Sequence, residues 1–153
     1  MAPRLNHVAI SMPAELLDDA GRAEIVDFYR EVFGWYPFAT NEASNPLVMA
    51  TGEFGQFVYL VAGDPPLRGG HLDHFGLMVD SEAELDEILA RAEQYRAHDD
   101  RVTIIPKKAD VPQKSKIGVT TLTNCYIGFV LPLIVELQYI HVVPHESNVP
   151  AST

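Results

Sequence analysis

Glu136 is an acidic residue in the middle of a largely apolar stretch of sequence. Residues 133–140 are rich in β-branched and aromatic side chains and contain neither glycine nor proline, a composition typical of a β-strand. A carboxylate inside such a strand costs several kcal/mol of folding free energy if it is left unpaired. Glu136 therefore needs a cation, a network of hydrogen-bond donors or a metal ion.

A histidine recurs in two similar segments of the chain. Asn6-His7-Val8-Ala9-Ile10 matches Asp73-His74-Phe75-Gly76-Leu77, which lies 67 positions further along. Both segments alternate in the manner of strands. An internal repeat of this kind fixes the architecture, because each copy is expected to form the same structural unit.

The elements predicted around these segments follow the same order twice: one strand, one helix and three strands. The first set covers residues 5–12, 22–33, 35–40, 47–51 and 56–62. The second set begins with a strand at 72–80 and a helix that starts after the capping box of Ser81 and Glu84. Its remaining strands cover residues 102–105, 120–129 and 133–142, with a long loop from 106 to 118.

We therefore predict an α+β fold made of two βαβββ modules in a single domain of residues 1–153. The first module covers residues 5–62 and the second 71–142; a Gly- and Pro-rich linker, 63–70, joins them, and 143–153 form a polar tail. Each module would offer one sheet face to its helix. The two free faces could then curl together into a cup-shaped, eight-stranded site.

Composition limits the partners of this chain. The formal net charge of −10 argues against nucleic acid and anionic membranes. The single cysteine, Cys125, excludes an internal disulfide, and the N-terminus carries no apolar signal region. No apolar run reaches membrane-spanning length. These features predict a cytoplasmic protein whose partner is a small-molecule substrate.

Four segments, in this order and spacing, resemble the vicinal oxygen chelate superfamily. That superfamily includes glyoxalase I, methylmalonyl-CoA epimerase, extradiol dioxygenases, fosfomycin-resistance proteins and bleomycin-binding proteins. The resemblance covers residues 5 to about 142 and rests on Asn6-His7-Val8-Ala9-Ile10, Phe28-Tyr29-Arg30-Glu31-Val32-Phe33-Gly34-Trp35, Asp73-His74-Phe75-Gly76-Leu77 and Val135-Glu136-Leu137.

The resemblance implies a divalent metal ion in the cup. The positions that match the family's ligands are His7, His74 and Glu136. Two imidazoles and one carboxylate suit a first-row divalent ion and leave coordination positions open for substrate or oxygen. We expect Fe(II) first, with Mn, Zn, Ni or Co as the other metals that this ligand set accepts.

Two tyrosines bear on the reaction type. Tyr59 stands where the four-ligand glyoxalases and epimerases carry an acid or amide, and a neutral phenol is a poor ligand and base. Tyr126 lies ten residues before Glu136, as a tyrosine does in extradiol dioxygenases, although residues 116–119 lack the histidine of that signature. This pattern predicts a dioxygenase-type activity in which Tyr59 and Tyr126 hydrogen-bond the substrate. The alternatives are a glyoxalase-like lyase, isomerase or thiol transferase, and a metal-free drug-binding protein of the bleomycin-resistance kind.

All the lysines of the chain fall in the predicted loop before the last hairpin: Lys107, Lys108, Lys114 and Lys116. They predict either a solvated loop or a flap that binds an anionic substrate over the cup mouth. Because half-cups expose sheet edges and apolar rims, we also expect a homodimer.

Overall fold

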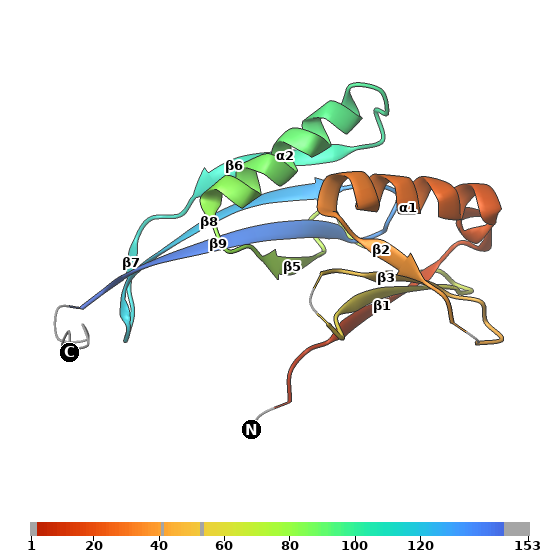
Figure 1. Ribbon diagram of the computed structural model, residues 1–153, viewed down its shortest axis with the longest axis horizontal. Helices are drawn as coiled ribbons and strands as arrows, with labels where there is room; N and C mark the ends of the chain where they lie inside the picture. Colours follow the sequence, from red (N-terminus) through yellow and green to blue (C-terminus); the bar gives the residue numbers. More distant parts are fainter. Residues whose placement is uncertain (1–2, 41, 53, 146–153) are drawn as a thin grey trace.

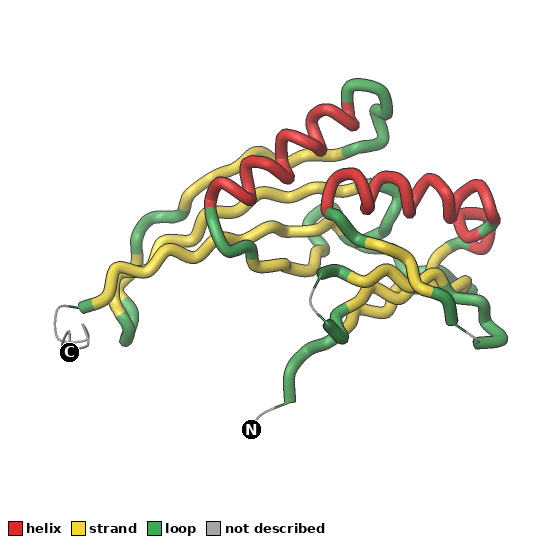
Figure 2. The backbone as a smooth tube through the Cα atoms, in the orientation of Figure 1, coloured by secondary structure: helices red, strands yellow, loops and turns green. Residues whose placement is uncertain are grey.

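Two β-sheets, each covered by one helix, form the protein (Figure 1). The computed structural model describes residues 3–40, 42–52 and 54–145. Both helices lie on the same outer side of the molecule and the sheets lie beneath them (Figures 1 and 2). The predicted α+β class with two βαβββ modules is confirmed.

The two modules share one topology. In the first, β1 (His7–Met12) leads through the short 3₁₀ helix η1 (Ala14–Leu17) and α1 (Asp19–Phe33) to β2 (Tyr36–Phe38), β3 (Leu47–Ala50) and β4 (Phe57–Ala62). In the second, β5 (His74–Met78) and α2 (Glu82–Arg96) precede β6 (Thr103–Ala109), β7 (Gln113–Lys114), β8 (Gly118–Gly128) and β9 (Ile134–Pro144). The strand orders β1-β4-β3-β2 and β5-β9-β8-β6 are equivalent, so the duplication seen in the sequence is also a structural one.

Local sequence signals set the helix ends. The Asp18 carboxylate accepts the Gly21 N–H at 2.8 Å and caps α1, which therefore begins three residues before the range predicted from apolar periodicity. Gly34 ends α1 in the left-handed region, at φ 73°, which glycine adopts without steric cost. Ser81 caps α2 by accepting the Glu84 N–H at 3.1 Å, as predicted.

The strands alternate between a helix-covered face and a free face. In β1 and β4, Ile10, Val58 and Leu60 are buried under the helices, whereas His7 and Tyr59 lie on the other face. The same parity holds in the second sheet, where Val135 and Leu137 are buried toward α2. The free faces carry the predicted histidines, tyrosines and acid of the site: His7, Tyr59, His74, Tyr126 and Glu136.

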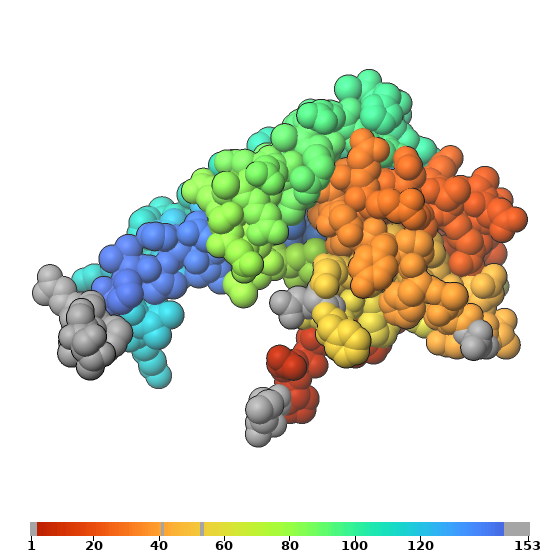
Figure 3. Space-filling model, viewed as in Figure 1, coloured from red at the N-terminus to blue at the C-terminus, as the bar shows by residue number. Residues whose placement is uncertain are grey.

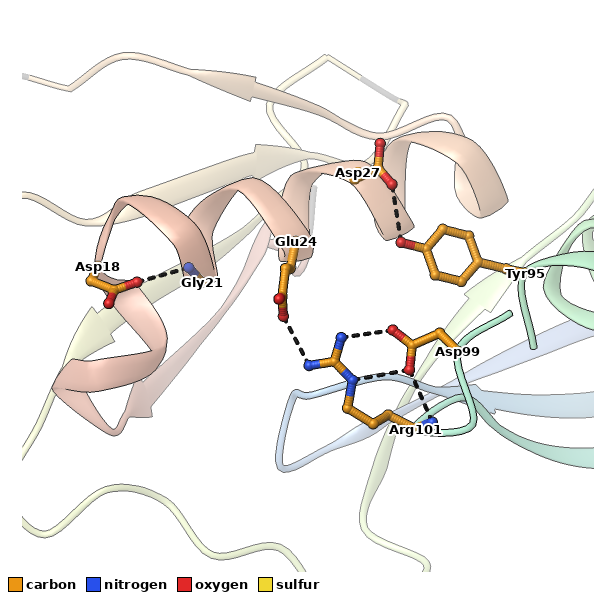
Figure 4. A network of polar contacts seen from close by, with 7 residues as sticks. All are labelled: Asp18, Gly21, Glu24, Asp27, Tyr95, Asp99 and Arg101. Carbon is orange, nitrogen blue, oxygen red and sulfur yellow. Dashed lines mark hydrogen bonds and ion pairs between the residues drawn. The ribbon is translucent and has the colours of Figure 1, made fainter. Parts of the chain in front are cut away.

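Polar contacts join α1 to α2 and to the loop that follows α2, and so hold the modules together (Figure 4). The Arg101 guanidinium donates to Glu24 on α1 at 2.8 Å and to Asp99 at 2.6 Å. Tyr95 on α2 donates its hydroxyl proton to Asp27 on α1 at 3.0 Å. Beneath these contacts the rings of Phe28, Tyr95 and Phe129 pack against one another, so one hydrophobic core runs through both modules.

The second module differs from its prediction between residues 106 and 118. The expected loop is largely strand: β6 continues to Ala109 across a register shift, and β7 pairs with the start of β8. β8 and β9 have 11 residues each and are longer than β5. The parts of these two strands that extend beyond β5 project from the body of the molecule as an arm (Figure 3). β9 also includes residues 143 and 144 of the predicted tail, and the rest of that tail, 146–153, lies outside the described residues.

None of the helices in the described part of the chain combines the length and the apolar character needed to cross a membrane.

Candidate metal site

Glu136 sits at the centre of the free face of the second sheet. Its register partners are Tyr126 on β8 and Gly76 on β5. Only 6% of the Glu136 side chain is exposed. Gly76 has no side chain, and a Cβ at position 76 would lie 3.6 Å from Glu136 Oε2, in contact with the carboxylate. The buried strand carboxylate predicted from the sequence is therefore present.

Three neutral side chains donate hydrogen bonds to this carboxylate. Glu136 Oε1 accepts from the Tyr126 hydroxyl and from Asn124 Nδ2, each at 2.7 Å, and Oε2 accepts from Gln138 Nε2 at 2.7 Å. These bonds compensate for much of the cost of burying the anion and fix the direction of both oxygens. Oε1 is saturated by two donors, which leaves Oε2 as the oxygen available to a cation.

His74 faces that remaining oxygen. Its Nε2 lies 3.2 Å from Glu136 Oε2, and its Nδ1 lies 2.7 Å from the carbonyl oxygen of Leu72. Because a carbonyl only accepts, Nδ1 carries the proton, and a neutral His74 directs an Nε2 lone pair at the carboxylate. Two acceptors at this distance require a proton or a metal ion between them.

The donor set fits a divalent ion. Metal–imidazole and metal–carboxylate bonds are about 2.0–2.2 Å, so two adjacent ligands are separated by roughly 3.0 Å in an octahedral site and about 3.4 Å in a tetrahedral one. The separation of 3.2 Å between His74 Nε2 and Glu136 Oε2 falls in this interval. The bond from Nδ1 to Leu72 is also the outer contact that commonly orients a metal-binding histidine.

The third predicted ligand, His7, lies on the other sheet. Its ring stacks on Phe57 at 4.8 Å between centroids, and its Nδ1 bonds Asn6 Oδ1 at 2.9 Å. Within residues 3–40, 42–52 and 54–145 of one chain, no three His, Cys, Asp or Glu side chains come close enough to hold a metal ion. His7 does, however, border a cleft of about 400 Å³ whose opposite wall includes Gly76, the neighbour of Glu136.

Tyr59 holds in the first sheet the position that Glu136 holds in the second. It pairs with Ala9 on β1 as Glu136 pairs with Gly76 on β5. Its hydroxyl donates to Glu42 Oε2 at 2.5 Å, and this bond raises the pKa of Tyr59 above its ordinary value. Tyr59 is thus engaged within its own module, and the structure does not bring it together with Tyr126.

The four lysines separate into different environments. Lys107 turns to the helix side and pairs with Asp86 and Glu82 of α2, which raises its pKa. Lys108 pairs in register with Asn124 and therefore lies on the free face with Glu136. Lys114 belongs to β7, whereas Lys116 lies in the short loop of residues 115–117 between β7 and β8, which is the part of the predicted loop that remains.

Asn124 and Gln138 are the site residues that sequence reasoning missed. Both share strand parity with Glu136 or Tyr126, so polar residues recurring at every second position of two apolar strands were the available signal. Asn124 is only 4% exposed, and its Oδ1 is a buried oxygen without a hydrogen-bond partner within the described residues.

The two-module α+β fold of this chain is the fold of solved structures of a fosfomycin resistance protein and a glyoxalase family protein, in agreement with the fold that the sequence resemblance implied. FosX, a fosfomycin resistance protein of Listeria monocytogenes, is 17% identical with a TM-score of 0.57, covering 91% of this chain and 94% of that one. A protein of Bacillus anthracis described as a glyoxalase family protein is 14% identical with a TM-score of 0.62, covering 92% and 98%. An integron cassette protein of Vibrio cholerae is 17% identical with a TM-score of 0.56, covering 91% and 96%.

Comparison with protein-family models and with curated protein sequences gives no match. The likeness to these structures therefore rests on shape, and the chemistry must be argued from the side chains of this chain.

Proposed function

We propose that this protein is a metal-dependent enzyme whose substrate is a small anion that chelates a metal ion through its oxygens. The divalent cation would be held by His74 and Glu136 of one chain and by His7 of a second copy of the chain. The observation that carries the proposal is the 3.2 Å contact between His74 Nε2 and Oε2 of the buried Glu136 side chain, with the His74 ring oriented by its Nδ1 contact to Leu72. A divalent cation bound there would supply Lewis-acid chemistry and a template for two substrate oxygens.

A second copy of the chain would supply His7. The free faces of both sheets carry exposed apolar side chains, among them Met78, which is 74% exposed, and Phe38, which is 44% exposed. Burying these faces against another copy would stabilise a homodimer by the hydrophobic effect. Such a dimer would bring the first module of one chain over the second module of the other and complete the ligand set.

The role of the chain's own residues follows from their contacts. Asn124, Tyr126 and Gln138 hold the Glu136 side chain in its orientation, and Lys108 on the same face would attract the anionic substrate. The depression beside Gly76 would exclude bulk water once a partner covers it.

Two reaction types fit this site. In the dioxygenase-type activity Tyr59 and Tyr126 would hydrogen-bond the substrate, but both hydroxyls donate their only proton to a carboxylate of this chain. That observation favours Lewis-acid chemistry of the lyase, isomerase or transferase kind. Metal-dependent oxygen uptake by Fe(II)-loaded protein with catechols or enediols would instead support the dioxygenase-type activity. Turnover of a hemithioacetal by the Ni or Zn form would support the lyase.

Metal analysis of protein purified anaerobically without a metal-binding tag tests the proposal. We expect about one divalent ion per chain, lost in His74→Ala and Glu136→Gln and retained in the control Glu87→Gln, which changes an exposed acid on α2. Stoichiometric ligand binding that survives loss of both His7 and His74 would instead indicate the metal-free binding protein.

Mixing two defective variants tests the origin of His7. In a homodimer of either variant, His7→Ala or Glu136→Ala, both metal sites lack a ligand. If each site takes its ligands from two chains, a dimer with one chain of each variant contains one complete site. About a quarter of the sites should then recover metal, because half of the dimers are mixed and each has one intact site. No recovery, with mixed dimers demonstrated by mass spectrometry, would place the third ligand within one chain.

A further inference from the structure

A small recess lies on the free face of the second sheet beside the proposed metal site. Its volume is about 70 Å³, room for about two or three carbon-sized groups. The residues that line it are His71, Thr103, Ile105, Tyr126, Gly128 and Ile134. None of them was singled out by the sequence as part of a substrate pocket except Tyr126.

Strand register ties the recess to the metal site. Ile134 is the partner of His74, and Ile105 is the partner of Tyr126, whose hydroxyl bonds Glu136. Residues two positions apart on a strand are separated by about 7 Å and point to the same face, so Ile134 and Glu136 are neighbours on that face. The Tyr126 ring meets the His74 ring edge to face at 5.3 Å and also lines the recess, so it borders both.

The recess is mainly apolar, and at Gly128 its lining is packed too closely to accept a side chain. A Cβ at Gly128 would lie 2.6 Å from Thr103 Oγ1 and 2.7 Å from Ile134 Cγ2, both of which line the recess. The Thr103 hydroxyl is directed to the Gly128 carbonyl at 3.4 Å. The two isoleucines and the tyrosine ring therefore provide most of the surface that a ligand would contact.

We infer that this recess binds a short aliphatic substituent, about two or three carbons long, on the oxygen-chelating anion held at His74 and Glu136. The inference rests on the proposed function and narrows its substrate class to 2-hydroxy or similarly oxygenated acids with a small alkyl group. Burial of each methylene should raise affinity about fourfold, until the recess is full.

The test uses Mn(II)-loaded wild-type protein and calorimetric titration with a homologous series of acids: glycolate, lactate, 2-hydroxybutyrate, 2-hydroxyvalerate and 2-hydroxyhexanoate. We expect affinity to rise from glycolate to an optimum at the ethyl or propyl side chain and to fall at the butyl one. Glycolate, which has no alkyl group, reports on the chelate site alone.

Two variants separate the recess from the rest of the fold. Ile105→Ala enlarges the recess and should move the optimum to a longer chain, whereas Gly128→Ala narrows it and should move the optimum to lactate or glycolate. Ile104→Ala is the matched control, because Ile104 packs on the opposite face against the core and pairs with the buried Ile127. It should leave the optimum where the wild type has it.

The outcomes distinguish the two proposals. If glycolate binds but affinity does not depend on chain length, or if Ile105→Ala shifts the optimum no more than Ile104→Ala does, the subsite is wrong and the chelate site stands. If the metal-loaded protein binds none of the acids, the proposed substrate class and the subsite are both overturned.

Discussion

Tyr126 donates its hydroxyl proton to Glu136 Oε1 across 2.7 Å, and the two residues face each other directly on β8 and β9. The hydrogen bond to the carboxylate raises the pKa of Tyr126 to about 12, because ionising the phenol would remove the proton that makes this bond. At neutral pH Tyr126 is therefore a hydrogen-bond donor that positions Glu136, and it is not a base.

Replacing Tyr126 with phenylalanine should weaken the site without dismantling the sheet. We expect metal affinity to fall about tenfold, the lower end of the effect of outer-shell contacts, and unfolding free energy to fall by about 1–3 kcal/mol. Calorimetric metal titration and urea unfolding measure the two effects. Tyr36→Phe, at an exposed position, is the control and should change neither.

Asn124 should matter as much as Tyr126, because it donates to the same oxygen and is more deeply buried. Asn124→Leu keeps the branched shape and the number of side-chain heavy atoms but removes the donor, so we expect a tenfold to hundredfold loss of metal affinity, about 1.4–2.7 kcal/mol. The double variant with Tyr126→Phe should lose more than the sum of the two single effects, since Glu136 Oε1 then has no donor. Strict additivity would contradict a shared role.

The two adjacent lysines should behave differently toward anions. Lys108→Met removes a positive charge from the face that carries Glu136 and should weaken binding of 2-hydroxybutyrate to the Mn(II) form about tenfold. Lys107→Met removes ion pairs with Asp86 and Glu82 on the helix side and should leave that affinity unchanged. The loss in Lys108→Met should shrink as salt is raised, and equal losses in both variants would contradict the assignment.

Tyr95 predicts an alkaline limit to the contact between the helices. Burial, and then the neighbouring Asp27, raise its pKa to about 12 from about 10 in the unfolded chain. A folded-state pKa above the unfolded value stabilises the fold fully below pH 10, and that contribution is lost as pH rises through 12. The stability advantage of wild type over Tyr95→Phe, measured by urea unfolding, should therefore shrink between pH 10 and pH 12. A constant difference would be inconsistent with this role.

Local patterns in the sequence determined the architecture. The repeated His7 and His74 segments, the apolar periods of the helices, and Gly34 and Ser81 at their ends are short-range signals, and the two βαβββ modules follow from them. The strand from 133 also identified Glu136 as a carboxylate in need of partners. These features depend on residues a few positions apart, which is why the chain alone reveals them.

Only the tertiary structure decided which residues are the partners of Glu136. Asn124 and Gln138 reach Glu136 because β8 and β9 pair in one register, and a shift by one residue would turn their side chains to the other face. The separation of His7 from His74 depends on how two whole sheets pack through α1 and α2. No local signal encodes that arrangement, because it is the sum of many weak contacts between distant parts of the chain.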